Sequence, residues 1–231
     1  MDQTLPEFFE VETGEKPQWS IIWLHGLGAD GWDFADLPRM LSLPAEPAVR
    51  FVFPHAPMRS ITLNNGMVMR GWYDLDGLEV SRKEDVVGLE QSSALVTALI
   101  EQEDVRGIST DQVVIGGFSQ GGALALHLGL RFTQKLGGIV GLSSYLPVLN
   151  RAYEERSDAN QTTSIFMAHG LFDPVVVLPF GQASCQALED MGYHVTWRTY
   201  PTQHSVVEPE MDDLSRWLVE RFRRFVAAKQ S

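Results

Sequence analysis

The serine at position 119 lies in the pattern G-x-S-x-G, which runs from Gly117 to Gly121. A Val/Ile-rich run precedes this serine and an Ala/Leu-rich stretch follows it, so a strand and a helix are expected to meet there. Such a turn is sharp and exposes the serine Oγ, and the flanking glycines allow the backbone to approach closely. The turn also places the N–H of Gln120 at the amino end of the helix, where it can stabilise negative charge. We therefore predict that Ser119 is a nucleophile for acyl transfer.

A serine nucleophile needs a base that takes its proton and a third group that fixes the tautomer of that base. Asp173 follows the apolar run 164–169, and His204 lies in the loop after the run 194–200. The resulting chain order Ser, Asp, His is the order that α/β-hydrolases use. We interpret the remaining histidines as ordinary hydrogen-bonded residues. One begins a strand, one lies inside the helix after Ser119, three lie at strand ends without a matching carboxylate, and none has metal-ligand spacing. They are His25, His55, His127, His169 and His194.

The stretch "HGLGADG", 25–31, also reads as the dinucleotide-binding pattern G-x-G-x-x-G. A dinucleotide fold requires an acidic residue about 20 positions further on to hold the ribose. The chain has "FVFPHAP", 51–57, at that place, which offers no carboxylate. The loop after the first long strand is instead where a second oxyanion donor is expected, and the N–H of Leu27 is the candidate.

These groups need a scaffold that brings distant loops to one edge. Six short apolar or β-branched runs predict strands: 19–24, 49–53, 112–118, 136–143, 164–169 and 194–200. Helical patterns lie between them, and several strands are apolar on both faces, which favours a mostly parallel central sheet with helices on both faces. We predict a single α/β-hydrolase domain over residues 1–231. The intervals between Ser119, Asp173 and His204 are too short for a large lid domain.

The segment from His55 to Glu84 does not fit this alternation. It is long, rich in turn residues, and carries Trp72 and Tyr73 near its centre. Long ordered loops in compact domains are often functional, but a surface meander with one buried tryptophan explains the pattern equally well.

Composition limits the function classes. The formal charge of −12 on 231 residues disfavours nucleic acid and anionic lipid surfaces as partners. Cys185 is the only cysteine, so an intramolecular disulfide is impossible, and we interpret this thiol as packed rather than reactive. The acidic start resembles no secretory leader, and no apolar run approaches the ~20 residues of a spanning helix. We expect a cytoplasmic protein without stable membrane insertion.

Several stretches together resemble the phospholipase/carboxylesterase family of α/β-hydrolases, which includes the acyl-protein thioesterases. They are "WLHGLGADGWDF", "FPHAP" with "ITLNNG" and "WYD", "GGFSQGGAL", "LGGIVGLSSYLP", "HGLFDPVV" and "YPTQHSV". The resemblance implies the triad Ser119, Asp173 and His204, with Leu27 and Gln120 as oxyanion donors. It also implies an acyl groove lined by residues such as Leu63, Trp72, Tyr145, Leu171 and Phe172.

Two departures from the family pattern lie beside the site. Ala29 separates "HGLG" from Asp30, and Gln203 stands where many relatives have glycine before the histidine. Neither removes a catalytic group, but both could alter selectivity.

These features predict a serine hydrolase that cleaves short to medium acyl esters or thioesters through an acyl-enzyme, without metal or cofactor. Its substrate is a small-molecule or lipid ester, such as a lysophospholipid, or an acylated protein. A peptidase or a lipase would share the triad and differ only in the pocket. The alternative from another class is a catalytically silent module of the same fold that binds a lipid or an acyl group.

Overall fold

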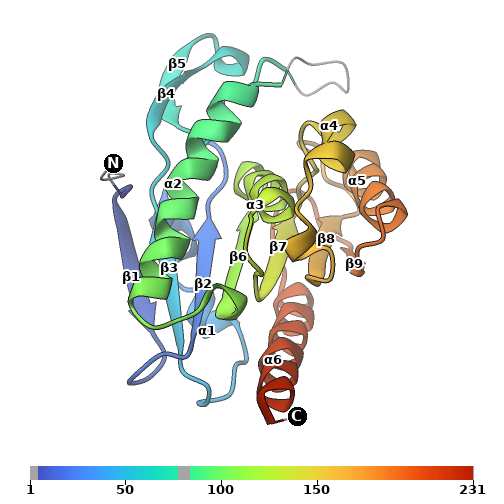
Figure 1. Ribbon diagram of the computed structural model, residues 1–231. Coiled ribbons are helices and arrows are strands. Elements are labelled where there is room, and N and C mark those ends of the chain that lie inside the picture. The colour runs from blue at the N-terminus through green and yellow to red at the C-terminus, as the bar shows by residue number, and fades with distance from the viewer. Residues whose placement is uncertain (1–4, 78–83, 231) are drawn as a thin grey trace.

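A seven-stranded sheet forms the centre of the protein (Figure 1). The computed structural model describes residues 5–77 and 84–230. In order across the sheet, the strands are β1 (Phe8–Glu12), β3 (Val49–Pro54), β2 (Trp19–Leu24), β6 (Val113–Phe118), β7 (Gly138–Leu142), β8 (Ile165–Gly170) and β9 (Val195–Tyr200). Only β1 pairs antiparallel with its neighbour, and the other pairings are parallel. All six predicted runs form strands of this sheet.

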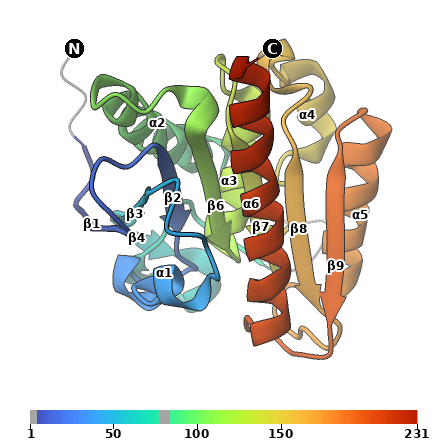
Figure 2. The ribbon, with the colours of Figure 1, turned by 90° about the horizontal axis from the view of Figure 1, so that it is seen from below.

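Helices cover both faces of the sheet (Figure 2). One face carries α2 (Val86–Val105), α3 (Gln120–Arg131), α4 (Leu149–Glu155) and α5 (Leu178–Asp190), and the other carries α1 (Leu37–Met40) and α6 (Glu208–Gln230). Strand β2 shows why both faces need cover: Ile22 and Leu24 pack into the core on the α3 side, whereas Ile21 and Trp23 pack into the core beneath α6. The predicted mostly parallel sheet with helices on both faces is confirmed, and the described residues contain no large lid domain.

The irregular segment after His55 contains a small hairpin, which the sequence reading did not predict. Its strands are β4 (Met58–Ile61) and β5 (Met67–Arg70), and it lies beyond the carboxyl ends of the parallel strands (Figure 1). Trp72 and Tyr73 follow the hairpin and are buried. Residues 78–83 of this segment lie outside the described residues.

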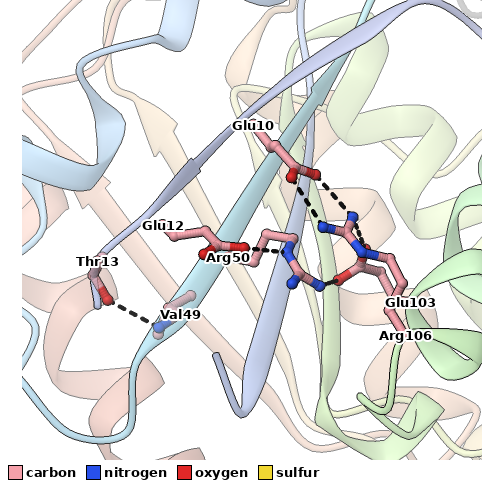
Figure 3. Close-up of polar contacts among 7 residues, drawn as sticks. All are labelled: Glu10, Glu12, Thr13, Val49, Arg50, Glu103 and Arg106. Atoms are coloured by element: carbon pink, nitrogen blue, oxygen red, sulfur yellow. Dashed lines mark hydrogen bonds and ion pairs between the residues drawn. The ribbon is translucent and has the colours of Figure 1, made fainter. Parts of the chain in front are cut away.

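The edge strand β1, also absent from the predicted strands, is held by a network of charged side chains (Figure 3). The buried guanidinium of Arg50 on β3 donates to Glu12 at 2.8 Å and to the buried Glu103 of α2 at 2.9 Å. Arg106, just after α2, binds Glu103 at 2.9 Å and Glu10 of β1 at 2.8 and 2.9 Å. Because each buried charge has a partner, the network joins β1, β3 and α2 without leaving an unpaired ion.

None of the helices within residues 5–77 and 84–230 is long and apolar enough to cross a membrane.

Candidate active site

Ser119 occupies a strained turn between β6 and α3. Its backbone has φ 55° and ψ −120°, a conformation that a non-glycine residue adopts only when its surroundings enforce it. A Cβ at Gly117 would lie 2.4 Å from the carbonyl oxygen of Leu24, and one at Gly121 would lie 2.2 Å from the same oxygen. Both positions therefore require glycine, because the elbow packs directly on the end of β2.

Three side chains named from the sequence meet at this turn. The Nε2 of His204 lies 3.0 Å from Ser119 Oγ, and its Nδ1 lies 2.7 Å from Asp173 Oδ2. Asp173 follows β8, His204 follows β9 and Ser119 follows β6. All three therefore lie at the carboxyl ends of parallel strands, on the same edge of the sheet. The bonds form one continuous line from the buried carboxylate to the hydroxyl.

The Asp173 carboxylate is buried but well supplied with donors. Burial acts to raise its pKa, but the bond from His204 and the amide N–H groups of Val175 and Val176 outweigh this effect, so the pKa is lowered from its ordinary value. The two amides donate to Oδ1 at 2.9 and 3.0 Å. Oδ2 is left to accept from His204, which favours an ionised acid that orients the imidazole.

A second histidine, His169, lies behind the carboxylate. Its Nε2 is 3.6 Å from Asp173 Oδ2 and bonds the carbonyl oxygen of Val176 at 2.7 Å. Burial lowers the pKa of His169, so the ring is neutral and Nε2 carries the proton that it donates to Val176. This bond fixes the turn that supplies amide donors to Asp173.

The sequence does not predict an aromatic contact to the His204 ring. The ring of Phe118, the residue before the serine, lies against the imidazole of His204 with centroids 4.7 Å apart. The G-x-S-x-G pattern leaves this position open, so no signal in the sequence points to the contact.

The loop of Leu27 is fixed from several sides. The buried His25 ring accepts from the Ala56 N–H at 3.0 Å and donates to the Gly26 carbonyl at 2.7 Å. Burial lowers the pKa of His25 to about 4, so the ring stays neutral and keeps one tautomer. Gly28, at φ 79°, donates its N–H to the Arg70 carbonyl at 2.8 Å.

A cavity of about 110 Å³ opens at the serine. Its lining is largely apolar and consists of Leu27, Leu63, Tyr73, Leu75, Gly77, Ser119, Gln120, Tyr145, Val175, Val176 and Phe180. Both proposed oxyanion residues thus share the cavity with Ser119. A larger hollow of about 680 Å³ lies between the loop after α1 and the end of α6 and contains none of the three aligned side chains.

Of the five residues that the family resemblance implies as lining of an acyl groove, two line the cavity and three do not. Leu63 and Tyr145 line the cavity. Leu171 and Phe172 are 42% and 66% exposed on the turn after β8 and do not line it. Trp72 is completely buried and lies behind the wall rather than in it.

The sequence matches the family model described as Phospholipase/Carboxylesterase over residues 6–220. The chain belongs to this family. It is 40% identical over 209 residues to an acyl-protein thioesterase 1 of Gibberella zeae, covering 86% of this chain and 88% of the relative. It is 42% identical over 212 residues to an acyl-protein thioesterase 1 of Neurospora crassa, with 87% and 86% covered.

Solved structures of plant proteins share the fold of this chain. Arabidopsis thaliana SOBER1 superposes with a TM-score of 0.84 at 30% identity, over 88% of this chain and 99% of that one. Zea mays acyl-protein thioesterase 2 gives a TM-score of 0.84 at 29% identity, over 94% and 99%. The protein is an α/β-hydrolase, and its family makes it an esterase or thioesterase that acts on acylated substrates.

Within the described part of the chain, no three His, Cys, Asp or Glu side chains are grouped so that they could hold a metal ion.

Proposed function

We propose that Ser119, His204 and Asp173 are the catalytic triad of this enzyme and that the reaction passes through an acyl-enzyme. The observation that carries the proposal is the line of bonds, 2.7 Å and 3.0 Å, from a buried carboxylate to a hydroxyl on the wall of an apolar cavity. This is the arrangement that a serine needs to act as a nucleophile.

In the acylation half, Ser119 Oγ attacks the acyl carbon while His204 Nε2 takes the hydroxyl proton. The carbonyl oxygen becomes an oxyanion, which the N–H groups of Leu27 and Gln120 stabilise by hydrogen bonds. The bond from the acyl carbon to the leaving oxygen or sulfur then breaks, and His204 gives its proton to the leaving group. Ser119 is left as an ester.

In the deacylation half, His204 takes a proton from a water molecule as that water attacks the acyl carbon. The same two N–H groups stabilise the second oxyanion, and the carboxylic acid leaves as Ser119 recovers its proton. Asp173 remains ionised throughout and holds the Nδ1–H of His204, so that Nε2 faces the serine.

For the substrate, we propose a short to medium acyl chain in the cavity and a bulky leaving group outside it. The apolar lining supports the first point, because each buried CH₂ contributes about 0.8 kcal/mol. The described residues form no lid domain over Ser119, and Leu171 and Phe172 next to Asp173 are exposed, which supports the second. The acyl-protein thioesterases among the relatives support an acylated protein as one substrate, and the family description Phospholipase/Carboxylesterase supports a lysophospholipid as another.

A comparison of matched substrates tests this function. The wild-type protein and Ser119→Ala are each assayed with a cysteine peptide that carries an S-octanoyl group, with an octanoyl lysophospholipid, and with 4-nitrophenyl esters from acetyl to octanoyl. We expect kcat/KM to rise with chain length and the variant to lose all turnover while remaining folded. Turnover that persists in Ser119→Ala would refute the triad, and a flat dependence on chain length would refute the acyl cavity.

A further inference from the structure

Trp72 joins two segments that both belong to the proposed oxyanion site. Its indole Nε1–H donates to the carbonyl oxygen of His25 at 2.9 Å, two residues before Leu27. Its backbone N–H donates to the side-chain Oε1 of Gln120 at 2.8 Å. The side chain is completely buried, so neither bond competes with water.

The carboxamide of Gln120 makes a second bond to the same stretch. Its Nε2 donates to the carbonyl oxygen of Tyr73 at 2.7 Å, and the side chain is buried. Trp72 and Tyr73 lie in neither a helix nor a strand, so their buried peptide groups depend on side chains for hydrogen bonds. A carboxamide has one acceptor and one donor end, which matches the N–H of Trp72 and the carbonyl of Tyr73 at the same time.

The hairpin completes the connection on the other side of Leu27. Gly28 donates its N–H to the carbonyl of Arg70 at 2.8 Å. A Cβ at Gly71 would lie only 2.9 Å from the Leu27 Cδ1, so the Leu27 side chain rests directly on this stretch. The segment 70–73 is thus bonded to the residues on both sides of Leu27 and to the side chain of Gln120.

We propose that Trp72 and the Gln120 carboxamide are positioning residues that fix the separation between the N–H groups of Leu27 and Gln120. The inference rests on the proposed function, because it takes these two groups as the oxyanion donors. One donor, Leu27, lies in the loop after β2, and the other, Gln120, is the first residue of α3. Each must lie about 2.7–3.1 Å from one developing oxyanion. Trp72 bonds both the loop of Leu27 and the side chain of Gln120, and Trp72 itself does not line the cavity.

Two variants remove the links and leave the donors in place. Gln120→Met keeps the length of the side chain and the backbone N–H but deletes both carboxamide bonds. Trp72→Phe keeps an aromatic ring but deletes the indole donor to His25. Misplaced donors weaken transition-state binding more than substrate binding, so kcat is expected to fall by roughly 10- to 100-fold with little change in KM.

A matched control removes a buried hydrogen bond outside the cavity. Ser215 on α6 is buried; its hydroxyl donates to the carbonyl oxygen of Met211 at 2.6 Å and accepts the N–H of Ser42 at 3.0 Å. We expect Ser215→Ala to lower Tm, as the other two variants do, but to leave kcat unchanged. The comparison therefore separates a loss of stability from a loss of donor geometry.

Two esters, 4-nitrophenyl acetate and 4-nitrophenyl octanoate, distinguish two roles for Trp72 and Gln120. These residues could position the two N–H donors, or they could only support the apolar wall that contacts the acyl chain. The acetyl group hardly uses the cavity, so displaced donors should lower kcat equally for both esters in both variants. The acid limb of the kcat/KM profile should not move, because the triad is untouched. If Gln120→Met does not fold, Trp72→Phe is judged by the same criteria.

Wild-type kcat in folded variants would overturn the inference, and so would a loss confined to KM of the octanoyl ester. Failure of the triad itself is a separate result, since it would show as turnover by Ser119→Ala. The inference can therefore fail while the proposed catalytic function stands.

Discussion

Phe118 lays its ring against the imidazole of His204, with centroids 4.7 Å apart and planes inclined by 47°. Behind it, Phe34 contacts Phe118 with a centroid separation of 5.8 Å. His204 comes from a loop, and its side chain is 17% exposed, so the ring is not enclosed by protein on every side. The bond to Asp173 fixes one end of the imidazole, and Phe118 supports one face.

We expect Phe118→Leu to lower kcat on the order of 10-fold with little effect on KM, because a poorly supported imidazole is less often aligned with Ser119. Steady-state kinetics with a 4-nitrophenyl ester measure both constants. Phe34→Leu is the matched control, since it removes a ring that contacts Phe118 and leaves the contact between Phe118 and His204 in place. Equal kcat values for Phe118→Leu and wild type would show that the contact plays no part in catalysis.

Asp173→Asn should keep the fold and lower turnover by up to roughly 10⁴-fold. The amide oxygen can still accept from Val175 and Val176, but the amide nitrogen would face Nδ1 and favour the wrong tautomer of His204. Thermal unfolding and kcat/KM with a 4-nitrophenyl ester measure the two effects. Near-normal turnover would mean that another carboxylate, for example Glu208, orients the base.

The buried carboxyl of Glu210 at the start of α6 predicts a dependence of stability on pH. Burial raises its pKa to about 8, and its Oε1 has no hydrogen-bond partner among the residues that the structure describes. The unfolded chain releases this proton near the ordinary value of about 4.3. The protonated Glu210 therefore makes its full contribution to the free energy of unfolding below about pH 4.3, and this contribution is lost as the pH rises toward 8.

Glu210→Gln removes this titration. The Tm of the variant minus that of the wild type should therefore increase as the pH is raised from 5 to 8, measured by differential scanning calorimetry. Glu208→Gln is the control, because Glu208 lies on the same turn but is exposed. A Tm difference between Glu210→Gln and the wild type that stays constant from pH 5 to 8 would contradict the raised pKa of Glu210.

Hydrolysis of monomeric esters should need no lipid interface. The described residues contain no lid domain above Ser119, and the chain carries a formal charge of −12, which disfavours anionic lipid surfaces. The rate measured against ester concentration should rise smoothly through the micelle threshold. A sharp increase at the threshold with little activity below it would indicate an interfacial gate.

The main sheet could be predicted from the sequence because its inner strands are buried on both faces and read as continuous apolar runs. Strand β1 could not, since "FFEVE" mixes acidic and apolar residues. Its two glutamates make sense only with Arg50 and Arg106, which come from β3 and the end of α2. The hairpin of β4 and β5 was missed because its strands are only four residues long.

The three aligned side chains could be named from the sequence because each follows a strand and their chain order is distinctive. The surroundings could not be named in the same way. Trp72 looked like a groove residue, but its bonds to His25 and Gln120 depend on two distant segments meeting behind the cavity wall. The contact between Phe118 and His204 likewise exists only after β6 and β9 have taken their places in the sheet.

Covalent labelling tests the central claim most directly. The wild-type protein is treated with a fluorophosphonate, digested, and mapped by mass spectrometry, with Ser119→Ala treated in parallel. We predict one modified peptide, with the label on Ser119, and no label on the folded variant. A label on Ser143, Ser144 or any other serine, or undiminished labelling of Ser119→Ala, would contradict the account.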